Sequence, residues 1–144
     1  AYRALAQQRP DAFTPNLATA LNNLGAMLDA LGRREEALTA TQEAVHLRRA
    51  LAEQRPDAFT PNLARSFGVL GSVFMSANRH AEALDTFARG LRLVLPFYER
   101  FPTAFAGLLQ FLARGILKAA QAGNLAIAKD LRPLVESLSD ATTD

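Results

Sequence analysis

The segment Arg9–Ala18 reads RPDAFTPNLA, and Arg55–Ala64 repeats it letter for letter, 46 positions later. An ungapped alignment of residues 1–46 with residues 47–92 gives 21 identical positions by direct count. A divergent third copy keeps the Pro, Ala and Phe of this phrase after a further 46 positions. The chain is therefore predicted to repeat one structural unit about three times.

The first unit is expected to open with an amphipathic helix. Leucines recur at steps of three and four from Leu17 to Leu31, which is the spacing of one helix face. Thr14 and Pro15 suit the start of this helix, with a hydroxyl residue as the cap and Pro at the first helical position. Gly32 suits its end, because glycine tolerates the left-handed conformation that often closes a helix.

A second helix is expected from about Arg34 to Arg55, where Pro56 would stop it. Each RPDAFTPNLA would then contain the end of one helix, a tight connection and the start of the next. A pair of helices cannot bury an apolar stripe alone, so each unit must stack on a neighbour that presents a similar surface. This predicts an all-α stack of antiparallel helix pairs.

Composition restricts the function. The 144 residues are 49% hydrophobic, which is enough for a core, but no window approaches the ~20 apolar residues of a membrane span. We expect no membrane association and see no signal-peptide pattern. The chain has no cysteine and a net charge of only +2 with interspersed signs, which argues against thiolate metal sites and nucleic-acid binding. We expect a cytoplasmic location.

These repeats resemble the tetratricopeptide repeat, whose pattern places Leu, Gly and Ala at fixed offsets within two helices. The matching positions of the first unit are Leu21, Leu24, Gly25, Leu28 and Ala37, and those of the second are Phe67, Leu70, Gly71, Phe74, Ala83 and Phe87. The resemblance implies an all-α, right-handed superhelical solenoid of antiparallel helix pairs, with about three repeats and a 46-residue period.

The period is longer than the family's 34 residues, and Arg49 stands where the family closes the repeat with Pro. The second helices should therefore be longer, which is most similar to the kinesin-light-chain subclass. A single solenoid unit over residues 1–144 is expected. Its parts are the end of a truncated repeat (1–9), repeat 1 (14–55), repeat 2 (60–101), a divergent repeat or cap (103–138) and a disordered tail (139–144).

Two details concern the last unit. The stretch Gly123–Leu131 is similar to the mid-repeat turns that follow Gly32 and Asn78, but displaced by one deleted residue. Pro133 falls in a stretch expected to be helical, so we expect a bend just before it.

The resemblance also implies a binding groove, because the first helices of such repeats line the concave face. Asn23 stands where related repeats often present an amide to the backbone of a bound peptide, and Asn both donates and accepts hydrogen bonds. The second repeat has Val69 at that position. The predicted partner-binding residues are Thr19, Asn22, Asn23, Ala26, Asp29, Arg65, Ser72, Met75 and Ser76.

Other polar residues are read as surface features. His46 and His80 lack the i, i+4 partner of a helical zinc site. Arg48 with Arg49 is interpreted as a solvated charge pair, with a place on the rim of the groove as the alternative. No nucleophile–base group, phosphate-binding loop or metal spacing occurs, so we predict no catalytic residues, no cofactor and no metal.

Two functions remain open. The first is a non-catalytic module that binds a protein or peptide partner in the groove. The second is self-association, or a structural or autoinhibitory role within a larger regulatory protein. The second follows from the apolar face of residues 16–31, which would stay partly uncovered and could bind a second copy. The sequence names neither the partner nor the pathway.

Overall fold

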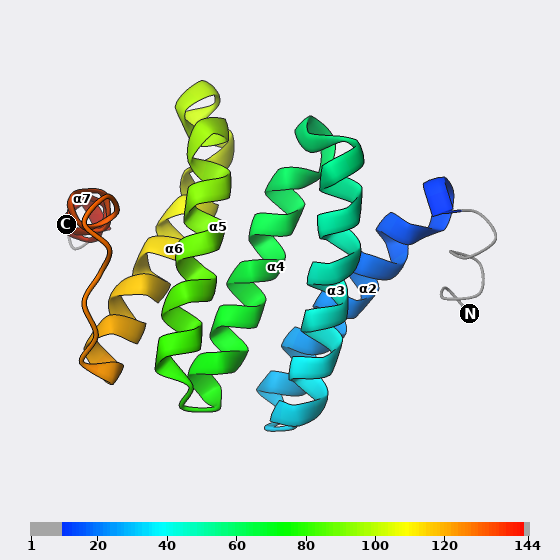
Figure 1. Cartoon of the computed structure of the whole chain (residues 1–144), viewed down its shortest axis with the longest axis horizontal. Coiled ribbons are helices and arrows are strands. Elements are labelled where there is room, and N and C mark those ends of the chain that lie inside the picture. Colours follow the sequence, from blue (N-terminus) through cyan, green and yellow to red (C-terminus); the bar gives the residue numbers. More distant parts are fainter. Residues whose placement is uncertain (1–9, 143–144) are drawn as a thin grey trace.

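The computed structural model describes residues 10–142, and all regular structure in that range is α-helical (Figure 1). The expectations for residues 1–9 and 143–144 lie outside the described residues. Six helices follow one another along the described chain: α2 (Pro10–Ala30), α3 (Arg34–Gln54), α4 (Pro56–Ser76), α5 (His80–Arg100), α6 (Pro102–Gly123) and α7 (Arg132–Thr142).

The helix boundaries repeat at the interval seen in the sequence. The helices α2, α4 and α6 begin at Pro10, Pro56 and Pro102, each 46 residues after the last, and α3 and α5 begin and end 46 residues apart. Each helix packs against the next along the chain from α2 to α6, and α7 packs on α6. The predicted solenoid of stacked helix pairs is therefore confirmed.

A single residue joins one pair to the next. Arg55 is the only non-helical residue between α3 and α4; its N–H donates to Leu51 O at 2.9 Å and its carbonyl accepts from Phe59 N–H at 3.1 Å. The expected helix start at Thr60, and at Thr14 in the first unit, is wrong. Pro56 starts α4, because a Pro at the first helical position loses no hydrogen bond. Pro61 then lies inside the helix, near its N-terminus.

The turn inside each pair uses a left-handed residue at the same repeat position. Gly32, Asn78 and Asn124 have φ of 79°, 60° and 53°, and they are spaced by 46 residues. In each turn the next backbone N–H donates to a carbonyl five residues back, as in a Schellman motif (Arg33 to Leu28, Arg79 to Phe74, Leu125 to Ala120). The third turn therefore keeps the register, and the deleted residue expected at Gly123 is not there.

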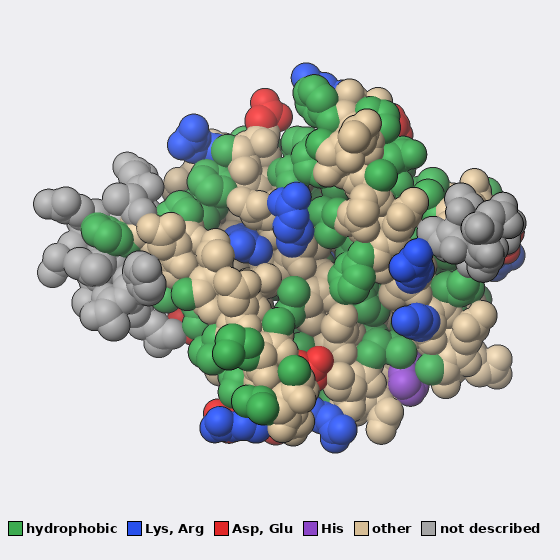
Figure 2. Space-filling view, turned by 180° about the vertical axis from the view of Figure 1, so that it is seen from behind, with side chains coloured by type: hydrophobic (Ala, Val, Ile, Leu, Met, Phe, Trp, Pro, Cys, Tyr) green, Lys and Arg blue, Asp and Glu red, His purple; other side chains and the backbone are tan. Residues whose placement is uncertain are grey.

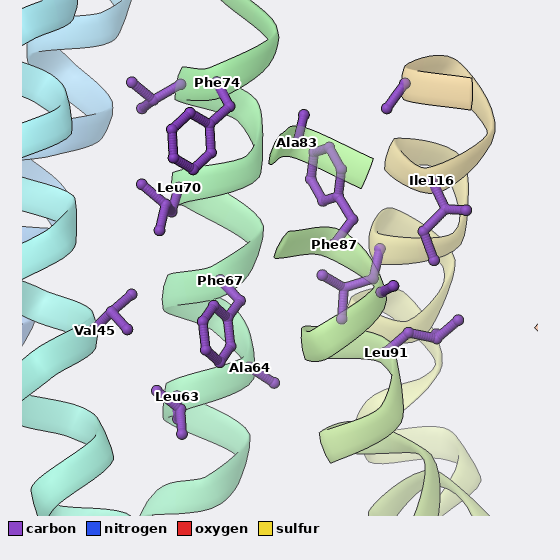
Figure 3. Close-up of a cluster of buried hydrophobic side chains, with 14 of the residues drawn as sticks. Val45, Leu63, Ala64, Phe67, Leu70, Phe74, Ala83, Phe87, Leu91 and Ile116 are labelled. Carbon is purple, nitrogen blue, oxygen red and sulfur yellow. The ribbon is translucent and has the colours of Figure 1, made fainter. Parts of the chain in front are cut away.

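The main hydrophobic core runs between α3, α4, α5 and α6 (Figure 3). Leu91, Leu109, Leu112 and Ile116 are fully buried in it. Phe87 of α5 is 2% exposed, and one edge of its ring lies against both α4 and α6. A buried side chain of this size contributes roughly 1.5–3 kcal/mol, so the stacked interfaces supply most of the stability.

The last unit departs from the repeat. After Asn124 the chain is non-helical to Leu131, and α7 then packs on α6. Pro133 is the second residue of α7, so the expected bend of a helix before it is wrong. Disorder from residue 139 is also wrong up to Thr142, because α7 contains no Gly or later Pro that would end it.

Candidate interaction groove

The spacing between helices defines a concave face. The backbones of α2 and α4, and of α4 and α6, approach each other closely, whereas those of α3 and α5 do not. The first helices therefore form a tight inner layer and the second helices a splayed outer layer. In Figure 1, α2 and α6 lie behind α3 and α5, so Figure 2, which is seen from behind, shows the side of the inner helices.

All nine predicted partner-binding residues lie on the two inner helices α2 and α4, and none belongs to the buried core. Those that are exposed are Thr19, Asn23, Ala26 and Arg65. Those that are half-buried are Asn22, Asp29, Ser72, Met75 and Ser76. The structure thus places them on the inner layer, and their contact with a partner stays a prediction.

Four of the nine come together in one cleft of about 300 Å³ between α2, α4 and α6: Asp29, Ser72, Met75 and Ser76. Ser76 Oγ donates to Asp29 Oδ2 at 3.1 Å, which ties the two inner helices together. Asp29 Oδ1 is buried and has no hydrogen-bond partner among the described residues. The other five predicted residues do not line this cleft.

Sequence reasoning missed the third wall of the cleft, which α6 supplies through Phe111, Arg114, Gly115 and Lys118. Repeat register would have found them. Phe111 and Lys118 lie 46 residues after Arg65 and Ser72, which the sequence analysis had placed in the groove, and Arg114 lies on the same helix between them.

Arg48 is not the solvated residue that the sequence suggested. It belongs to the outer helix α3 but is only 7% exposed, because its side chain passes between α2 and α4. Its guanidinium donates to Ser66 Oγ at 2.8 Å, to the Asn62 carbonyl at 3.1 Å and to Thr19 Oγ1 at 3.2 Å. Burial, and secondly the nearby charge of Arg65, lowers the pKa of Arg48.

The expectation of a solvated side chain, which is wrong for Arg48, holds for Arg49. It is exposed, and its guanidinium lies 5.8 Å from the centre of the Phe67 ring. It also borders a second cleft of about 400 Å³ on the outer side, where α3 and α5 diverge over α4. Glu82, Asp85 and Arg89 of α5 line the opposite wall, so this outer cleft carries both signs of charge.

The first helix keeps an exposed apolar strip. Leu24, Met27 and Leu31 are 45%, 63% and 70% exposed, whereas Leu17, Leu21 and Leu28 are buried. The repeat equivalent of Leu24 is Leu70, which α3 reduces to 7% exposure. The strip therefore marks a face that a further helix could cover.

Residues 17–57 match a family model described as the tetratricopeptide repeat. The chain contains a tetratricopeptide repeat. The matched residues run from the middle of α2 through α3 to the start of α4. The second tetratricopeptide-like pair, α4 and α5, follows from the identical helix bounds 46 residues later. The kinesin-light-chain-like subclass stays a prediction.

No curated protein and no solved structure gives a significant match to the chain. In residues 10–142, no helix combines the length and apolar character needed to cross a bilayer. Within the same described range, no three His, Cys, Asp or Glu side chains are grouped so as to hold a metal ion. His80 is half-buried, with an unpartnered Nδ1, and His46 is exposed.

Proposed function

We propose that this chain is a non-catalytic protein-interaction module that binds a peptide or helix of its partner in the groove formed by α2, α4 and α6. Tetratricopeptide repeats generally mediate protein–protein interaction. The observation that carries the proposal is the cleft of about 300 Å³ lined by Asp29, Ser72 and Met75. It combines an apolar floor with unpaired polar groups, which is the usual make-up of a ligand site.

The test is a selection of binders from an unbiased displayed peptide library on the purified chain. Met75→Lys, which would fill the floor of the cleft with a charged chain, should abolish capture of the selected peptides. Asn23→Ala tests the predicted contact with the peptide backbone and should weaken capture of the selected peptides. Gln42→Lys, on the rim of the outer cleft, is the matched control and should have no effect. Capture that depends on Gln42 rather than Met75 would contradict the proposal.

Self-association is the second candidate, and the exposed strip on α2 favours it. Leu24, Met27 and Leu31 present apolar area that no described helix covers. Light scattering over a range of concentrations should show a rising mass, and the double substitution Leu24→Gln, Leu31→Gln should restore the monomer mass. A constant monomer mass for the parent chain would exclude this candidate.

A cytoplasmic location is part of the first proposal, and imaging of the tagged protein in cells would test it.

A further inference from the structure

The groove contains a buried charge that the described residues do not neutralise. The guanidinium of Arg48 lies between the inner helices α2 and α4, where all its hydrogen bonds go to neutral oxygen atoms of Thr19, Asn62 and Ser66. These bonds use three of the five N–H donors of the group. A buried ion that lacks an opposite charge is costly, so this position favours a bound anion.

Three other basic side chains of the inner helices are also without carboxylate partners among the described residues. Arg65 on α4 makes one side-chain bond, to the neutral Asn62 Oδ1 at 2.9 Å. Arg114 and Lys118 on α6 border the cleft and form no ion pair with the residues that the structure describes. In Figure 2, Lys and Arg side chains accordingly lie across the middle of this face.

Four of the arginines outside the groove are paired with carboxylates. Arg33 and Arg79 pair with the glutamates three residues later at 2.6 Å. Arg89 pairs with Asp85 at 3.3 Å, and Arg92 with Asp130 at 3.1 Å. The net charge of the whole sequence is only +2, but Arg114 and Lys118 share the cleft with a single carboxylate, that of Asp29, and Arg48 and Arg65 add two more positive groups to the inner layer.

The groove also requires hydrogen-bond donors from its ligand. Asp29 Oδ1 and Asn22 Oδ1 on α2 are buried acceptors that have no partner among the described residues. A phosphodiester backbone has no hydrogen-bond donor for these two acceptors, and its negative charge would be repelled by the Asp29 carboxylate. A peptide supplies N–H donors along its backbone and, where it contains Asp or Glu, carboxylates for the guanidinium groups.

We infer that the groove binds an acidic stretch of a protein partner, with side-chain carboxylates held by Arg48 and Arg65 and by Arg114 and Lys118. The peptide backbone donates to the free acceptors of α2, and apolar side chains of the ligand lie on Met75 and Phe111. This inference rests on the proposed function and adds the charge of the partner to it.

Peptides selected from the unbiased library provide the test. They should be enriched in Asp and Glu, and their dissociation constants, measured by fluorescence anisotropy as C-terminal amides, should rise with salt. Replacing their Glu and Asp by Gln and Asn should weaken binding at least tenfold. Arg65→Gln and the pair Arg114→Gln, Lys118→Gln should do the same. These residues are exposed, so the variants should fold, whereas Arg48→Gln serves only as a supplement.

The control is Arg89→Gln, which makes the same change of charge on the outer side and should leave the dissociation constant unchanged. Selected peptides without acidic enrichment, or ones indifferent to Arg65 and Arg114, would overturn this inference and leave the proposed function intact. A library that yields no groove binder would overturn the proposed function itself. Equal binding of an oligothymidylate through the same residues would overturn the assignment to a peptide.

Discussion

The close packing of α4, α5 and α6 around Phe87 gives a prediction of definite sign, the effect of Gly71→Ala on stability. A Cβ atom at Gly71 would lie 2.6–2.8 Å from three carbons of the Phe87 ring. These distances are well inside the 3.5–4.0 Å optimum for carbon pairs. The ring cannot easily withdraw, because the same edge also lies against Gly115 on α6, and the side chain is only 2% exposed.

The size of the stability change in Gly71→Ala follows from two opposing contributions. Alanine gains about 1 kcal/mol over glycine in a helix interior. Overpacking a well-filled core costs about 1–3 kcal/mol, and three ring carbons at once place Gly71 at the upper end. The free energy of unfolding should therefore fall by about 2 kcal/mol. Gly107→Ala is the matched control: it is also helical but has nothing within 4 Å, so it should gain about 0.5–1 kcal/mol.

The assay is urea unfolding followed by circular dichroism, with the free energy obtained by linear extrapolation. Gly71→Ala in a Phe87→Leu background should be neutral or stabilising, which gives a coupling energy of about 2 kcal/mol in the double-mutant cycle. If Gly71→Ala proves as stabilising as Gly107→Ala, α4, α5 and α6 do not meet as closely as described, and the wall of the groove is misplaced.

Three further outcomes are expected from the same unfolding assay. Leu70→Ala should cost about 2–5 kcal/mol, whereas Leu24→Ala, at the same repeat position but 45% exposed, should cost under about 1 kcal/mol. Gly32→Ala should cost about 1–2 kcal/mol through its φ of 79° alone, because nothing lies within 4 Å of the added methyl; an unchanged stability would contradict that conformation. The hydrogen bond from Arg92 lowers the pKa of Asp130, so the pair stabilises the fold above the ordinary Asp pKa of about 3.9 and loses this effect as pH falls through the lowered value. Arg92→Gln should therefore lower the unfolding midpoint at pH 7 but not at pH 2, and an equal loss at both values would contradict the assignment.

The fold could be predicted almost completely because one period governs it. The interval of 46 residues sets the helix bounds, the left-handed residues at Gly32, Asn78 and Asn124, and the order of packing. The helix starts were misplaced because RPDAFTPNLA contains two prolines, and each suits the first helical position. The structure selects Pro56, since Arg55 alone can both end α3 and begin α4.

The site was predicted in part, and the error at Arg48 has a physical cause. Two adjacent arginines differ by about 100° around a helix of 3.6 residues per turn, so only one of them can face inward. Arg48 stands eleven residues after the buried Ala37, and with Thr41 and Ala44 it continues one stripe along α3. The charge of Arg48 suggested an exposed side chain. Its long aliphatic stem instead crosses the apolar layer and places the guanidinium between the inner helices.

The same position explains why net charge was a poor guide to the partner. Near-neutral composition indicates weak attraction only when opposite charges lie near one another. Here the outer helices carry their own carboxylates beside Arg33, Arg79 and Arg89, and those ion pairs are satisfied within the fold. No carboxylate of the described residues pairs with Arg48, so its unneutralised charge lies where two inner helices meet at the groove. A partner that binds there gains from neutralising that charge, and selectivity for acidic segments follows from the position of the arginine rather than from the number of charges.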